Sequence, residues 1–256
     1  MLSAGIDIGA QNLKVVILDD NDLLSYRVVP SGWDTENALG RAFRDVLEES
    51  GVSEESLKHI GATGMSRETV SFATSFTIDS TSGAKGVTWV IPSARTVIDI
   101  GAEQSRVFSC DQTGKVLDRV RNDQCAAGAG AFLEEISARL DLELEEMGKL
   151  SLSSNKNITI NSTCVIFAES EVVSLINEGV NKEDISRSIV EAVADKAVSL
   201  LRSIKALDDI VFIGGVAMNQ GVVDSVRKQI GKEILVPPEP RIVSAIGAAL
   251  VARDMS

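Results

Sequence analysis

Hydrophobic and polar positions alternate along this 256-residue chain with two periods, one typical of strands and the other of helices. Short apolar runs that end in glycine predict strands, the clearest being those at residues 6–9 and 210–215. Apolar residues at three- and four-residue spacing predict helices at about 36–49, 130–140, 166–178, 183–205, 219–230 and 242–253. Because the two signals alternate, we expect an α/β protein whose mixed sheets carry helices on their faces.

One short sequence occurs twice. Residues 6–10 and 98–102 both read IDIGA, and QNLKVVILDDND from Gln11 aligns more loosely with EQSRVFSCDQTG from Glu103. Each copy predicts a strand, a tight glycine turn, a second strand and a polar turn. Two unrelated hairpins are the alternative, but an identity over five residues favours a duplication.

The duplication predicts two lobes, with a boundary near the proline of WVIPSAR. We expect lobe I to comprise residues 1–93, with the helix of about 242–256 packed back on it. Lobe II would comprise residues 94–241, which include the second copy of the repeat and all the glycine- and cysteine-containing motifs described below.

An aspartate ends the first strand of each copy, and a glycine turn follows it directly, so that the backbone can approach a ligand closely. If a pseudo-twofold axis relates the copies, Asp7 and Asp99 face each other and can hold Mg²⁺, which keeps several of its waters. The two turns would then clamp the phosphates of one nucleotide. Lys14 reaches these phosphates or is a solvated strand residue. The residues assigned to this site are Gly9, Ala10, Gln11, Asn12, Lys14, Gly101 and Ala102.

Two further glycine-rich stretches are candidates for nucleotide contacts. In GAGAF we assign Gly128 and Gly130, although such a stretch also occurs at ordinary helix entries. GGVAMNQG follows a predicted strand and opens a helix, which favours contact with adenosine through Gly214, Gly215 and Asn219. Close packing between helix and strand explains these glycines equally well.

Composition narrows the classes of function. The chain is 44% hydrophobic and 24% charged, as in globular proteins, and no apolar run reaches the roughly 18 residues of a membrane span. Its formal net charge of −12 argues against bulk binding of nucleic acid. The N-terminus lacks a basic start and a cleavage site, so we expect a cytoplasmic protein with neither a membrane nor a nucleic-acid partner.

The three cysteines are too few for a disulfide framework in such a protein. Cys110 aligns with Leu18 in the repeat, which predicts a thiol packed in the core. Cys125 lies in NDQCAAGAG and Cys164 in NSTCVIFAES. The residues alone leave buried structural thiols, a metal site and a redox role open for these two.

IDIGAQNLK, IDIGAEQS and FIGGVAMNQG together resemble the two phosphate motifs and the adenosine motif of the actin, sugar kinase and heat-shock ATPase superfamily. Within it, NDQCAAGAG and STCVIFAESEV are similar to ATPases of the BadF/BadG/BcrA/BcrD type. These are activators of 2-hydroxyacyl-CoA dehydratases and ATPase subunits of benzoyl-CoA reductase. The resemblance covers nearly the whole chain and implies a two-lobed actin- or ribonuclease-H-like ATPase fold, with ATP or ADP in the cleft.

The resemblance also implies that two subunits, identical or homologous, share one [4Fe–4S] cluster, to which each contributes Cys125 and Cys164. A shared zinc ion would use the same four thiolates. Both cysteines precede predicted helices, so a tilt of these helices at the ATP site would change the surroundings of the cluster. Glu169 and Glu171 lie near the cluster or are carboxylates of the first helical turn.

For the reaction, the resemblance implies that a ferredoxin-like donor reduces the cluster and that ATP hydrolysis drives one electron to a partner. This partner is an iron–sulfur reductase or dehydratase component that acts on a CoA thioester. Asp7 and Asp99 would organise Mg²⁺, and Glu103 or Gln104 would orient the attacking water. The GAQ and GAE turns favour the benzoyl-CoA reductase type over the dehydratase activator. A kinase with Asp99 as base and a nucleotide-dependent scaffold are the alternatives without a cluster.

Overall fold

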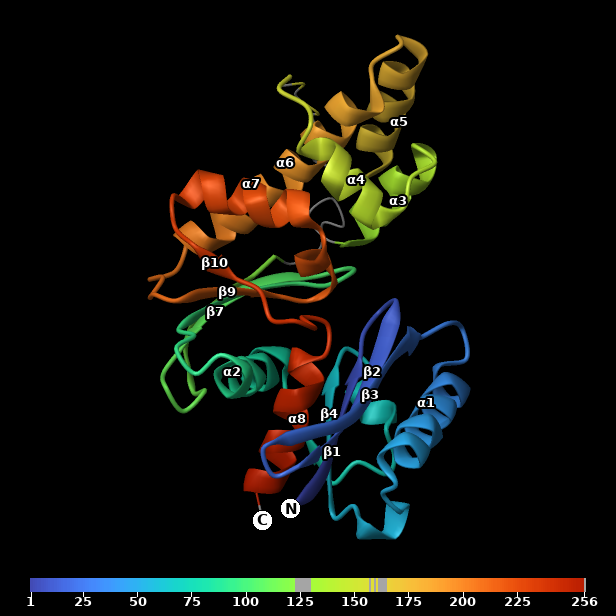
Figure 1. The fold of residues 1–256 in the computed structure, drawn as a ribbon, viewed down its shortest axis with the longest axis vertical. Coiled ribbons are helices and arrows are strands. Elements are labelled where there is room, and N and C mark those ends of the chain that lie inside the picture. The colour runs from blue at the N-terminus through green and yellow to red at the C-terminus, as the bar shows by residue number, and fades with distance from the viewer. Residues whose placement is uncertain (123–129, 157, 159, 161–164, 256) are drawn as a thin grey trace. The chain divides into compact units, whose positions relative to one another are not determined.

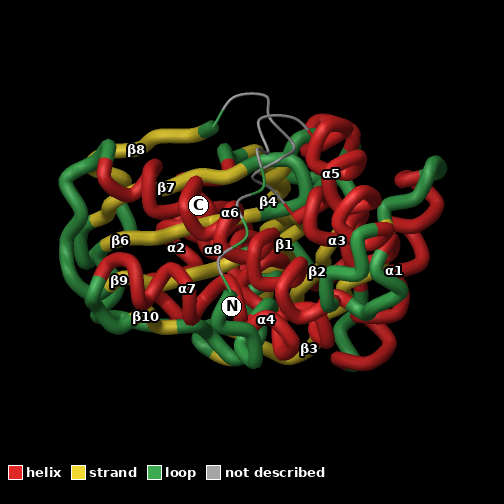
Figure 2. The backbone as a smooth tube through the Cα atoms, turned by 90° about the horizontal axis from the view of Figure 1, so that it is seen from above, coloured by secondary structure: helices red, strands yellow, loops and turns green. Residues whose placement is uncertain are grey.

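The computed structural model describes residues 1–122, 130–156, 158, 160 and 165–255. Their strands form two five-stranded sheets (Figures 1 and 2). The first has the order β3-β2-β1-β4-β5 and comprises β1 (Leu2–Ile8), β2 (Asn12–Asp19), β3 (Asp22–Pro30), β4 (His59–Gly64) and β5 (Ser75–Phe76). The second has the order β10-β9-β6-β7-β8 and comprises β6 (Thr96–Ile100), β7 (Ser105–Cys110), β8 (Val116–Arg121), β9 (Ile210–Ile213) and β10 (Ile234–Leu235).

Packing contacts divide the chain into two compact units. Unit 1 comprises Met1–Val97, Phe108–Asp118 and Pro237–Ser256, and unit 2 comprises Ile98–Val107 and Arg119–Val236. The chain thus leaves unit 1 and returns to it twice. The lobe limits expected from the sequence stay a prediction.

The first sheet buries both of its faces, because successive residues of a strand point to opposite sides. On β2, Leu13, Val15 and Ile17 join the apolar cluster that contains α1 (Thr35–Ser50). The alternate residues Val16 and Leu18 join a second cluster with α8 (Val243–Asp254). In Figure 1, α1 and α8 accordingly lie on opposite faces of this sheet.

Helix α8 lies unusually close to its neighbours in unit 1. A Cβ atom on Gly5 of β1 would overlap the carbonyl oxygen of Ala245, and one on Gly61 of β4 would overlap that of Ala248. Side chains at these two strand positions would therefore push the helix away from the sheet.

Helix α2 (Asp79–Val90) packs alongside α8 (Figure 1) and was not predicted from the sequence. Its segment is rich in serine, threonine and glycine, which are weak helix formers. A Cβ atom on Gly86 would overlap the carbonyl oxygen of Val243, and one on Gly247 that of Ser82. The small residues that weaken the helix signal are thus those that allow the two helices to touch.

Unit 2 carries its helices over one large apolar core, in which Phe132, Ile189 and Phe212 are almost fully buried. The helices of this unit are α3 (Gly130–Arg139), α4 (Leu144–Ser151), α5 (Val165–Asn177), α6 (Lys182–Arg202) and α7 (Gln220–Ile230). Across both units, the six helices predicted from periodicity are confirmed to within a few residues, whereas α4 was missed.

The expected α/β class is confirmed, and both copies of the repeat form strand–turn–strand hairpins, β1–β2 and β6–β7. Within the described residues, no helix has both the length and the apolar character needed to cross a membrane.

Candidate functional site

Asp7 lies near the end of β1, where its side chain is largely buried and faces Lys14 of β2. The antiparallel register pairs the two residues, and Lys14 Nζ donates to Asp7 Oδ2 at 3.0 Å. Gly64, the last residue of the parallel strand β4, has a φ of +94°. A Cβ atom at Gly64 would lie 2.7 Å from Asp7 Oδ1, so only glycine leaves this carboxylate its space.

The turn after Asp7 is closed by a hydrogen bond from the Gly9 N–H to the Asn12 carbonyl, at 3.1 Å. Ser31, which follows β3, anchors this turn twice. Its backbone N–H donates to the Gln11 carbonyl at 2.8 Å, and its hydroxyl donates to the Gly9 carbonyl at 2.9 Å. Ala10, at the tip, is exposed.

Asp99 occupies the matching place in unit 2. Its side chain is largely buried near the end of β6 and pairs with Arg106 of β7, whose Nη1 lies 3.4 Å from Asp99 Oδ2. Gly214, directly after β9, has a φ of +89°. A Cβ atom there would lie 2.9 Å from Asp99 Oδ1 and overlap the carbonyl oxygen of Ile100.

The second turn closes in the same way as the first but is anchored by a helix. The Gly101 N–H donates to the Gln104 carbonyl at 2.9 Å. The first two N–H groups of α3, those of Gly130 and Ala131, donate to the carbonyls of Gly101 at 2.7 Å and of Ala102 at 2.8 Å. Gly130 therefore contacts the turn directly, and the start of α3 is tied to it.

The predicted residues thus form two groups, one in each unit. Asp7, Gly9, Asn12 and Lys14 lie together, as do Asp99, Gly101, Gln104, Gly130 and Gly214, with Glu103 exposed on its turn. Their roles toward Mg²⁺, nucleotide and attacking water stay predictions.

Asn219 is only 1% exposed and caps helix α7. Its Oδ1 accepts the N–H of Val222 at 3.1 Å, and its Nδ2 donates to the Leu144 carbonyl at the start of α4, also at 3.1 Å. Gly215, by contrast, faces open space, since a Cβ atom there would have no neighbour within 4 Å. The adenosine contacts assigned to both residues stay predictions, and Asn219 in any case joins α7 to α4.

Cys125, Cys164 and Gly128 lie outside the described residues. Cys110 is a buried free thiol, as its alignment with Leu18 predicts. Burial raises the pKa of this thiol from its ordinary 9.0 to about 11, which keeps it protonated and unreactive. The residues that the structure describes hold no group of three or more His, Cys, Asp or Glu side chains suited to a metal ion.

Three residues of these two groups were not predicted from the sequence: Gly64, Arg106 and Ser31. The repeat contained the signal for Arg106, which aligns with Lys14 ninety-two positions earlier (106 − 14). Gly64 was detectable as a glycine that ends an apolar strand. Nothing local in the sequence marks Ser31, because its partners come from the turn of another hairpin.

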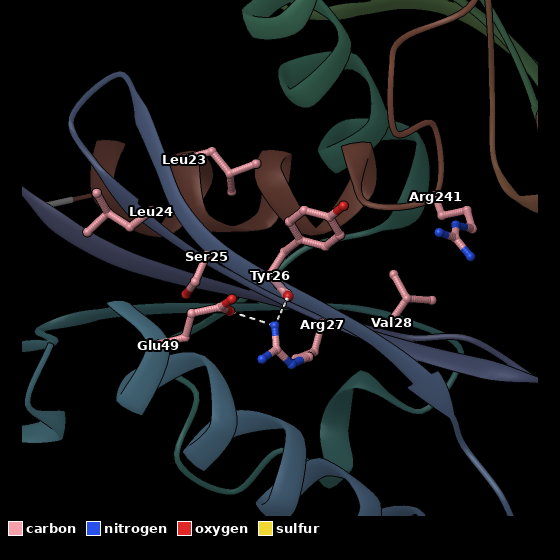
Figure 3. A pocket seen from close by; sticks show the side chains of 8 residues that line it. All are labelled: Leu23, Leu24, Ser25, Tyr26, Arg27, Val28, Glu49 and Arg241. Atoms are coloured by element: carbon pink, nitrogen blue, oxygen red, sulfur yellow. Dashed lines mark hydrogen bonds and ion pairs between the residues drawn. The ribbon is translucent and has the colours of Figure 1, made fainter. Parts of the chain in front are cut away.

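One surface cavity of unit 1, of about 460 Å³, contains none of the predicted residues (Figure 3). It lies along the edge strand β3, lined by Leu23 to Val28 together with Glu49 and Arg241. Arg27, one of the lining residues, donates to the carboxylate of Glu49 at 2.5 Å and to the Tyr26 carbonyl at 2.9 Å. This internal pairing leaves the cavity without a free charge from Arg27 or Glu49 to offer a ligand.

Comparison with known proteins gives a match over nearly the whole chain. Residues 4–252 match the model of the BadF/BadG/BcrA/BcrD ATPase family. The activator of lactoyl-CoA dehydratase from Anaerotignum propionicum is 37% identical and is covered over 98% of its length by 99% of this chain. One of the subunits of benzoyl-CoA reductase from Thauera aromatica is 30% identical, with 92% of it covered by 97% of this chain.

The fold also matches a solved structure, that of the activator of 2-hydroxyisocaproyl-CoA dehydratase from Clostridium difficile with bound ADPNP. The TM-score is 0.94 at 36% identity, and the match covers 100% of this chain and 95% of the other. A nucleotide-binding ATPase is thus similar to this chain throughout its length.

Proposed function

The chain belongs to the BadF/BadG/BcrA/BcrD ATPase family, and on this premise we propose that it is an ATP-driven activator of a 2-hydroxyacyl-CoA dehydratase. In this role it passes a low-potential electron to the dehydratase component. The three relatives named as dehydratase activators are 33%, 36% and 37% identical, against 30% for the relative from benzoyl-CoA reductase. This order favours the dehydratase over the reductase partner that the GAQ and GAE turns indicated.

The observation that carries the proposal is the twofold occurrence of one arrangement. In each unit a buried aspartate stands before a closed glycine turn, beside a basic residue and a glycine at positive φ. The space that a Cβ atom on Gly64 or Gly214 would fill lies beside the carboxylate, where a nucleotide and its hydrated Mg²⁺ need room.

In the proposed reaction, Asp7 and Asp99 would hold the waters of Mg²⁺, which would supply positive charge next to the phosphates, and N–H groups of the turns would bind phosphate oxygens. Lys14 and Arg106 neutralise charge next to the two carboxylates. Glu103 or Gln104 orients the attacking water. Phosphoryl transfer needs this positioning and charge neutralisation more than it needs covalent help from the protein.

Cys125 and Cys164 are the proposed cluster ligands, and the chemistry of the donor set supports them. The chain has three cysteines, and Cys110 is buried with a raised pKa, which disfavours the thiolate that an iron ligand requires. Two thiols per chain remain, so a second subunit, identical or homologous, completes a set of four. A bound [4Fe–4S] cluster would supply one-electron chemistry, with a ferredoxin-like protein as donor.

The experiment that tests this function is anaerobic purification, with iron and sulfide measured per chain. We expect about two irons and two sulfides per chain in the wild type, consistent with one cubane per dimer. Cys125→Ser and Cys164→Ser should each lose most of the iron, whereas Cys110→Ser, the matched control, should keep it. Iron-free protein that still dimerises and hydrolyses ATP would contradict the cluster.

The partner is tested with the iron-loaded protein, ATP and a strong reductant. We expect activation of a 2-hydroxyacyl-CoA dehydratase component and no support of benzoyl-CoA reduction by the catalytic subunits of that enzyme. The reverse result would restore the reductase assignment.

A further inference from the structure

Helix α3 is connected at its N-terminal end to the second glycine turn. The N–H groups of Gly130 and Ala131 donate to the carbonyls of Gly101 and Ala102. Gly130 also fits closely against the turn, since a Cβ atom there would lie 3.0 Å from the Gly101 oxygen. A movement of this turn therefore moves the start of α3.

At its C-terminal end, α3 is connected to α5 by an ion pair. Arg139, the last residue of α3, pairs through Nη2 with Glu169 of α5. The same nitrogen lies 3.3 Å from Oε1 of Glu135, one turn earlier on α3. Arg139 thus has one partner on its own helix and one on the neighbouring helix.

We propose that the Arg139–Glu169 pair is a positioning contact that carries the nucleotide state of the second turn through α3 to α5. The inference rests on the proposed function, which places nucleotide at that turn. Helix α5 begins at Val165, directly after Cys164. Arg139 contacts Glu135 on its own helix and Glu169 on α5 at the same time, so it joins the last turn of α3 to α5.

The pair contributes little to the stability of the fold. The side chains of Arg139 and Glu169 are 50% and 28% exposed, and ion pairs in such positions add little to stability. Both helices also bury apolar side chains in the core of unit 2, namely Phe132, Leu133 and Ile136 of α3 and Ala168 and Val172 of α5. Removing the charges should therefore leave the fold intact and change only how α5 follows α3.

The test is hydrogen–deuterium exchange of the peptide covering residues 165–177, measured on the full-length protein with and without MgADPNP. We expect nucleotide to change the exchange rate of this peptide in the wild type. In Arg139→Gln and in Glu169→Gln the change should shrink about twofold or more, the scale of a part-exposed ion pair. Glu135→Gln is the matched control, because it removes only the partner within α3 and should retain the change.

The charge-reversed pair, Arg139→Glu with Glu169→Arg, should restore part of the response. The inference is overturned if Arg139→Gln responds like the wild type, or if nucleotide leaves α5 unchanged in the wild type. Iron content, measured on the same samples, reports on the proposed function separately. Iron-free protein with an intact exchange pattern would refute the cluster and retain the coupling.

Discussion

The two copies of the repeat form the same local arrangement with different supports. Asp7 and Asp99, Lys14 and Arg106, and Gly64 and Gly214 occupy equivalent places, and each turn closes through one N–H to carbonyl bond. The supports differ, because the first turn is held by the backbone and hydroxyl of Ser31 in a loop, whereas the second is held by the N-terminus of α3.

Because their supports differ, the two turns are connected to the rest of the chain in different ways. A loop serine can keep the first turn in shape without transmitting its movement far, since the hydroxyl belongs to a short connection. A helix is a rigid body, so its N–H groups couple the second turn to residues a helix length away. On the proposed function, the first turn would hold the nucleotide locally, and the second would also connect it to α3.

The largest effect should follow from neutralising either carboxylate. Asp7→Asn and Asp99→Asn keep the side-chain shape but remove the charge to which the proposed function assigns Mg²⁺, so we expect each to lower the kcat of ATP hydrolysis about 100-fold or more. Steady-state ATPase assays with circular dichroism as a folding check measure this. If only one variant loses activity, the two copies do not serve one reaction.

The next largest effect concerns Gly64 and Gly214, the glycines that lie against the two carboxylates. Gly214→Ala places a Cβ atom against Ile100 and Asp99 at a φ of +89°, and we expect it to lower the free energy of unfolding by about 3 kcal/mol. Gly231→Ala is its control, with a φ of +63° but open space around the Cβ atom, and should cost about 1 kcal/mol. Urea titrations compare them.

The same comparison applies to the first copy, with Gly64→Ala against Gly51→Ala, whose φ is +67° in open space. Equal losses in the two members of either pair would show that backbone strain alone acts, without crowding of the carboxylate.

A smaller effect should follow from releasing the support of the first turn. Ser31→Ala removes the buried hydroxyl that donates to the Gly9 carbonyl but keeps the backbone bond to Gln11. We expect a loss of about 1 kcal/mol in the free energy of unfolding, together with weaker nucleotide binding. The exchange response of residues 165–177 to nucleotide should persist at saturating ligand. Loss of this exchange response would mean that the first turn also helps to carry the nucleotide state to α5.

The smallest effect concerns Cys110, which stands where the first copy has Leu18. The pKa of the thiol is raised in the folded state, from 9.0 to about 11. The folded chain therefore keeps its proton where the unfolded chain loses it, so stability is full below pH 9 and falls as the pH rises toward 11. Urea titrations across this window should show less pH dependence in Cys110→Ala. An unchanged slope would mean that other groups cause it.

Much of the candidate site could be predicted from the sequence alone. The repeated IDIGA located both aspartates and both turns, because the strand, the glycine and the following strand are local features that need no distant partner. The apolar periodicity of α6 and α7 likewise predicted helices, since each has a clear buried face. Cys110 was placed in the core by alignment with Leu18 alone.

Features that depend on contacts between distant segments emerged only when the chain had folded. Helix α2 forms from weak helix formers because Gly86 and Gly247 let it touch α8, and this contact joins segments more than 150 residues apart (247 − 86). Asn219 became a buried cap for α7 for a similar reason, since its second partner is the Leu144 carbonyl. Ser31 and Arg139 gained their roles from the Gly9 turn and from Glu169. Local sequence determines which residues form turns and helices. The partners of a small or polar side chain, however, exist only after the chain has packed.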